Sequence, residues 1–71
     1  MKFAVVIEKS EGSMGFGAYV PDLPGCVAVG DSVEEVTQLI REGMTLHLEA
    51  MRADGDMIPV PTTIVRELDV A

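Results

Sequence analysis

Few residues of this chain are of the types that do chemistry, and their surroundings favour structural roles. His47 is the only histidine, and no cysteine, serine or carboxylate stands in local motif spacing with it. Cys26 is the only cysteine, and its acidic neighbourhood does not offer the electropositive setting that makes a thiol reactive. We interpret His47 as a packed or interface histidine and Cys26 as a small core residue, and we expect no catalytic residue.

Three further patterns resemble ligand sites, but each lacks an essential part. Asp54-Gly55-Asp56 lacks the spaced oxygen ligands and the distal glutamate of a calcium loop. Glu34 and Glu35 are neighbours in a predicted helix, where adjacent side chains diverge by about 100° and cannot easily share a metal or a proton. The glycine-rich residues 12–17 lack the spacing and the following helix of a phosphate loop. We therefore expect no metal and no cofactor.

Composition points to a protein that binds another protein. The net charge is −7 and aromatic residues make up 4% of the chain, which argues against a surface that tracks phosphates and stacks bases. A basic protein partner fits this charge better. The hydrophobic fraction of 48% is high for a chain of 71 residues, so another subunit should cover part of the apolar surface. We predict a homo-oligomer, either a dimer or a tetramer, with no direct binding of nucleic acid.

The location predicted from the sequence is cytoplasmic. The N-terminus lacks the charged and then apolar run of a signal peptide, and a single cysteine cannot form an internal disulfide. The longest apolar run, residues 3–7, has the length of a strand, so no membrane role is expected.

The pattern of apolar residues and turns predicts an α+β domain with the order β-β-β-α-β. Residues 2–8, 16–20 and 26–30 read as strands of an antiparallel meander, because short loops rich in glycine, serine and proline separate them. A long helix over residues 32–52 should begin with a capping box of Ser32 and Glu35, in which each side chain reaches the unpaired N–H of the other residue, and should stop near Asp54-Gly55. Residues 64–70 alternate as a charged edge strand, which gives a sheet of three to four strands packed on one helix.

The faces of this sheet can be assigned from the size of the side chains. Phe3, Val5 and Ile7 should face the core. The opposite face should then be small and mostly apolar, and we place on it Ala4, Val6, Ala18, Cys26 and Ala28. Such a flat face would favour close approach by another subunit.

The helix is longer than the strands and should overhang the sheet. It spans roughly 30 Å, whereas the strands reach only about 15 to 20 Å. The overhanging end carries apolar side chains that the chain itself does not cover. We predict an oligomer interface there, made by Leu46, Leu48, Met51 and Met57.

Several of these segments together resemble the HicB antitoxin family. The resemblance lies in residues 17–26 (Gly-Ala-Tyr-Val-Pro-Asp-Leu-Pro-Gly-Cys), in Gly30-Asp31-Ser32 with Glu34-Glu35 at the helix start, and in Ile58-Pro59-Val60-Pro61. It covers nearly the whole chain. It implies a partial ribonuclease-H-like fold without the catalytic carboxylates, and a partner of the HicA type, a small basic toxin that cleaves messenger RNA. Many HicB proteins also carry a C-terminal DNA-binding domain, whereas we expect residues 1–71 to form a single domain without one.

The resemblance implies an antitoxin that occludes the active surface of such a toxin. We consider Tyr19, Asp22 and Leu23 as partner-binding residues, although turn chemistry alone accounts for every residue of their loop. Two other functions remain open. The chain could be an orphan oligomeric binding module without a toxin, or, as a remoter alternative, a metal-dependent nuclease, which would need several converging carboxylates.

Overall fold

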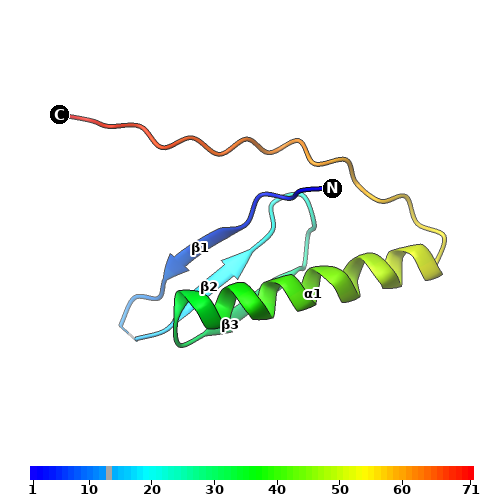
Figure 1. Ribbon diagram of the computed structural model, residues 1–71, viewed down its shortest axis with the longest axis horizontal. Coiled ribbons are helices and arrows are strands. Elements are labelled where there is room, and N and C mark those ends of the chain that lie inside the picture. The colour runs from blue at the N-terminus through cyan, green and yellow to red at the C-terminus, as the bar shows by residue number, and fades with distance from the viewer. Residues whose placement is uncertain (13) are drawn as a thin grey trace.

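The computed structural model describes residues 1–12 and 14–71 as a three-stranded antiparallel sheet with one long helix on one face (Figure 1). The strands are β1 (Val6–Lys9), β2 (Phe16–Tyr19) and β3 (Val27–Gly30), in the order β1-β2-β3, and the helix is α1 (Val33–Ala53). The predicted α+β architecture is confirmed. Ser13, within the predicted glycine-rich hairpin, lies outside the described residues.

The register of the sheet explains why β1 begins later than the predicted residue 2. Val6 lies opposite Tyr19 and Lys9 lies opposite Phe16. β2 has only four residues, so it pairs with only four residues of the first strand. Phe3 and Val5 nevertheless pack against the core ahead of the paired strand.

The core lies between the sheet and α1, and it contains residues that we had placed on the opposite face. Ile7, Ala18 and Ala28 form one row across the three strands. Ala18 and Cys26 are buried, and Ala28 packs against the same cluster. The predicted placement of Ala18, Cys26 and Ala28 on the outer face is therefore wrong. α1 packs against β2 and β3, and the small side chains of Ala18 and Ala28 let the helix approach the sheet. The inward placement of Phe3, Val5 and Ile7 is confirmed.

The loop over residues 21–25 consists of two tight turns built around a buried leucine. The N–H of Leu23 donates to the carbonyl of Val20 at 3.0 Å, and the N–H of Cys26 donates to the carbonyl of Leu23 at 3.1 Å. The second turn has Pro24 in its second position and Gly25 at φ +86° in its third, which is the residue pattern of a type II turn. Leu23 is completely buried, so this loop closes one end of the core.

The start of α1 follows the predicted capping box in part. The N–H of Glu35 donates to the Ser32 hydroxyl at 3.0 Å, as expected for an N-cap. The Glu35 carboxylate accepts at 2.8 Å from the N–H of Asp31, one residue before the predicted donor. In this position the carboxylate lies next to Gly30, where an added Cβ would be 2.9 Å from Oε1 of Glu35. Gly30 therefore makes room for the cap.

The end of α1 is a Schellman motif. Gly55 takes a φ of +74°, its N–H donates to the carbonyl of Arg52 at 3.2 Å, and the N–H of Asp56 donates to the carbonyl of Met51 at 2.9 Å. The predicted stop at Asp54-Gly55 is confirmed. At 21 residues α1 is about 31 Å long, against about 13 Å for each strand, and Figure 1 shows it extending well past the sheet.

The C-terminal segment (residues 57–71) is extended but does not join the sheet. Figure 1 shows it leaving the end of α1 and running past the sheet on the β1 side. In the described part of the chain the strands are β1, β2 and β3, so the last strand that we predicted over residues 64–70 is absent from the single chain. Pro59 and Pro61 each fix φ and so stiffen the connection from α1. Asp22 binds Thr62 and Thr63, and in this position the residues after Thr63 lie away from the sheet edge.

Candidate protein-binding surfaces

The face of the sheet that points away from α1 is apolar and open. Two rows cross it: Val6, Tyr19 and Val27 in one, and Glu8, Gly17 and Val29 in the other. We call these six residues the outer sheet face. Val27 is 70% exposed and Val29 is 77% exposed. A shallow hollow of about 410 Å³ lies over Gly17, where an added Cβ would meet nothing within 4 Å. Adjacent exposed apolar side chains are typical of surfaces that bind other proteins.

We did not identify Val27 and Val29 as surface residues from the sequence. Their alternation with Ala28 shows that they share a face, but alternation alone does not tell which face is inward. The available signal was Gly30, which must pack against the start of α1. It fixes Ala28, two residues earlier, on the helix side.

Acidic side chains gather at the end of the sheet where α1 begins. Lys9, Phe16 and Gly30 lie opposite one another across the strands, so the first hairpin and the start of α1 are at the same end. We call the exposed acids there the acidic rim, which comprises Glu8, Glu11, Asp31, Glu34 and Glu35. The rim borders the outer sheet face through Glu8. A cluster of negative charges of this kind attracts basic groups.

Asp22, one of the predicted partner-binding residues, holds the C-terminal segment. Its carboxylate accepts hydrogen bonds from the N–H and hydroxyl groups of Thr62 and Thr63, at distances between 3.0 and 3.2 Å. The N–H of Thr63 contributes most to holding the pKa of Asp22 below its ordinary value. Anchoring the segment accounts for Asp22 without a partner protein.

Tyr19 and Leu23, the other two predicted partner-binding residues, lie in opposite environments. Tyr19 is 43% exposed on the outer sheet face. Leu23 is completely buried, so its side chain has no surface to offer a partner. Of the three predicted residues, only Tyr19 lies beside Val27 and Val29.

The residues predicted for an oligomer interface are spread around the far end of α1. Leu46 is 66% exposed and Met57 is 90% exposed, whereas Leu48 and Met51 are half-buried. Leu48 packs against the core from the sheet side of the helix. Leu46 and Leu48, two positions apart on the helix, therefore lie on different sides of α1, and an oligomer interface made by the four residues stays a prediction.

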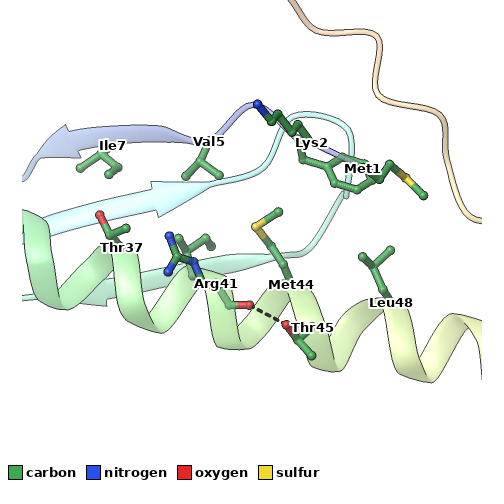
Figure 2. Close-up of a pocket in the computed structure, with 11 residues that line it drawn as sticks. Met1, Lys2, Val5, Ile7, Thr37, Arg41, Met44, Thr45 and Leu48 are labelled. Atoms are coloured by element: carbon green, nitrogen blue, oxygen red, sulfur yellow. Dashed lines mark hydrogen bonds between the residues drawn. The ribbon is translucent and has the colours of Figure 1, made fainter.

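An apolar groove separates β1 from α1, and Leu48 lines it (Figure 2). Its volume is about 500 Å³. Val5 and Ile7 point from the β1 side toward the helix, and Met44 and Leu48 rise from α1 toward them (Figure 2). The groove is open because α1 lies closest to β3 and β2 and touches the β1 side less extensively. We call it the β1–α1 groove.

The residues that could do chemistry stay apart. Cys26 is buried, and burial raises the pKa of its thiol. His47 is half-buried on α1. Among residues 1–12 and 14–71, no group of three or more histidine, cysteine, aspartate or glutamate side chains is placed to hold a metal ion. No helix in that part of the chain is long and apolar enough to cross a membrane.

Comparison with known sequences places relatives in distant organisms. A UPF0150 protein of Archaeoglobus fulgidus is 38% identical over 68 residues, which cover 93% of this chain and 97% of the relative. A UPF0150 protein of Synechocystis sp. is 35% identical, with 96% of this chain and 85% of the relative covered. A UPF0150 protein of Helicobacter pylori is 44% identical over 54 residues, with 76% of this chain and 72% of the relative covered.

A solved structure and a family model agree on the family of this chain. The N-terminal domain of the antitoxin HicB of Burkholderia pseudomallei superposes with a TM-score of 0.79 and 26% identity, over 89% of this chain and 74% of that one. The model of the HicB-like antitoxin of bacterial toxin–antitoxin systems matches residues 3–69. The chain therefore belongs to the HicB-like antitoxin family.

Proposed function

We propose that this protein is an antitoxin that binds a small basic toxin of the HicA type and neutralises it by covering its active surface. The observation that carries the proposal is the outer sheet face, an exposed apolar surface bordered by the acidic rim. Family membership supplies a toxin as the class of partner. On this proposal the protein acts in the cytoplasm as a stoichiometric binder and not as a catalyst.

The two parts of the surface have different tasks. The affinity comes from burying the exposed side chains of Val27, Val29 and Tyr19 against the partner. Burial of apolar area contributes roughly 25 cal/mol per Å². The acidic rim attracts basic side chains and orients the toxin. Surface charges are screened within about 8 Å at physiological ionic strength, so added salt should slow association more than it speeds dissociation.

The test titrates this protein into a messenger-RNA cleavage reaction run by a purified HicA-type toxin. Cleavage should stop at a fixed molar ratio of the two proteins, as expected for occlusion. Val29→Asp should weaken binding by more than about tenfold, because it places a charge in the apolar contact. The matched control is Glu49→Asp, which leaves the charge unchanged on the exposed surface of α1. Unchanged inhibition by Val29→Asp would show that another surface meets the toxin.

A second pair of variants tests the acidic rim, and both variants carry the same total charge. Glu8→Gln with Glu34→Gln removes two charges from the rim, and Glu49→Gln with Asp56→Asn removes two from the opposite end of α1. Only the first pair should lower the association rate with the toxin at low salt. Absence of any complex with such toxins would favour the alternative of an orphan oligomeric module.

A further inference from the structure

The C-terminal segment displays a row of apolar side chains that nothing in the single chain covers. Ile64 is 82% exposed, Leu68 is 80% exposed and Val70 is 91% exposed. In an extended chain these residues share one face, and Glu67 and Asp69 lie on the other. A lone extended strand with an apolar face is not stable in water, so this face needs a sheet to join.

The sheet lacks a strand at the place where the apolar groove opens. β1 is an edge of the sheet, and its outward N–H and C=O groups are available for pairing. The β1–α1 groove lies directly beneath this edge, between Val5 and Ile7 on one side and Met44 and Leu48 on the other. A strand added beside β1 would point alternate side chains into the groove. The other edge, β3, offers no such space because α1 packs against it.

The protein's own segment is held away from that position. Pro59 and Pro61 each fix φ and restrict the residue before them, so the connection from α1 is extended. Thr62 and Thr63 are then fixed on Asp22 by four hydrogen bonds. The residues after Thr63 then run past the sheet on the β1 side (Figure 1). The anchor thus presents residues 64–70 outward.

We propose that residues 64–70 of a second copy of this chain add a strand beside β1 and fill the β1–α1 groove, and that two copies exchange these segments reciprocally. Ile64, Leu68 and Val70 would enter the groove, while the stem of Arg66 would cover its rim and carry the guanidinium out to water. Glu67 and Asp69 would lie on the same side as Lys2, whose ammonium points away from the groove (Figure 2). Each copy has one groove and one segment, so the exchange closes as a twofold dimer.

This arrangement removes two weaknesses of the single chain at once. The exposed apolar row becomes buried, and the edge of β1 becomes paired. A chain of 71 residues has a marginal core on its own, and the strand from a partner enlarges that core. The outer sheet face stays free in the dimer, so the exchange does not depend on the proposed toxin binding.

Sedimentation equilibrium of the full chain tests the exchange. The natural protein should be a dimer, and Leu68→Asp should raise the dimer dissociation constant by about 100-fold or more, since it moves a charge into the groove. The matched control is Val65→Asp, which places the same charge on the opposite face and should leave the dimer intact. Circular dichroism should show the same helix content in all three proteins. A natural protein that stays monomeric at high concentration, or equal effects of the two substitutions, would overturn the proposal.

Cross-linking separates exchange between copies from docking within one chain. Glu8→Cys on β1 and Glu67→Cys in the segment place two exposed thiols in one chain, while Cys26 remains buried. A bismaleimide should join the double variant into a covalent dimer. Mixing the two single variants should give a covalent heterodimer, and the natural protein should give no cross-linked product. A product of monomer mass from the double variant would show that each segment docks on its own β1, and would overturn the exchange.

Discussion

The carboxylate of Asp22 joins two parts of the chain that lie 41 residues apart, because it accepts both the N–H of Thr63 at 3.1 Å and its hydroxyl at 3.0 Å. Thr62 donates to the same carboxylate through its N–H and its hydroxyl, each at 3.2 Å. An aspartate in a proline-flanked loop would ordinarily be assigned to its own turn. Here it positions the C-terminal segment.

The anchoring of the segment should depend on pH in the acid range. Hydrogen bonds from Thr63 and Thr62 lower the pKa of Asp22 in the folded protein relative to the unfolded chain. The contribution of the anchor is therefore complete above the ordinary pKa of about 4 and is lost as the pH falls through the lower, folded value. Amide hydrogen exchange at Thr62 and Thr63, corrected for intrinsic rates, should speed up across that window. Protection that stays constant down to full protonation would contradict this.

Asp22→Asn should release the segment at neutral pH. In the natural protein both carboxylate oxygens of Asp22 accept hydrogen bonds. The asparagine amide has only one acceptor oxygen and carries no charge. Limited proteolysis should then cut residues 64–70 faster than in the natural protein, with little change in the helix signal. Asp56→Asn, which removes an exposed charge after α1, is the control and should leave the cutting rate unchanged.

Leu23→Ala should unfold the protein more readily, by about 2 to 5 kcal/mol, because it empties a completely buried site at the end of the core. Leu46→Ala removes the same atoms from a side chain that is 66% exposed and should cost much less. Urea unfolding followed by circular dichroism measures both. Equal small effects would mean that the loop over residues 21–25 is not part of the core.

Gly30→Ala should destabilise the fold by about 1 to 3 kcal/mol, because the new Cβ would lie 2.9 Å from Oε1 of Glu35 and 3.1 Å from the backbone nitrogen of Val36. Gly17→Ala is the control, since a Cβ there meets nothing within 4 Å, and it should change stability by no more than about 0.5 kcal/mol. Thermal unfolding of the two variants decides the point. A tolerated Gly30→Ala would show that the helix start can shift.

Ser32→Ala should cost about 1 kcal/mol, because the N–H of Glu35 loses its acceptor at the start of α1. Ser32→Asp keeps an acceptor oxygen and adds a charge that suits the helix dipole, so it should preserve stability. Chemical denaturation of both variants provides the comparison. A loss of the same size in Ser32→Asp would point to a role of the hydroxyl beyond capping.

Elements that depend on local sequence were predictable here. The second and third strands, the serine cap and the Asp54-Gly55 stop are each encoded within a few residues, and the structure places them where the sequence indicates. The two turns of the 21–25 loop follow in the same way from the conformational limits of proline and glycine. Family resemblance rested on these same segments.

Features that depend on distant contacts were not predictable. The inward face of β3 is decided by how closely α1 approaches Ala28, and within β3 only Gly30, which makes room for the start of α1, is a sign of that approach. The anchor on Asp22 needs Thr62 and Thr63 to arrive from another part of the chain. Residues 64–70 do have a strand pattern, but the pattern does not tell whether a strand pairs within its own chain.

The Asp22 anchor also sets an order of events during folding. The hairpins and α1 form from contacts close in sequence, which close quickly, whereas the anchor must wait until the 21–25 loop and the end of α1 both exist. The C-terminal segment is therefore the last part of the chain to be placed. A subunit contact made through that segment would follow its placement and would depend on protein concentration. A cell that makes little of this protein would hold folded single chains whose pairing is limited by encounter.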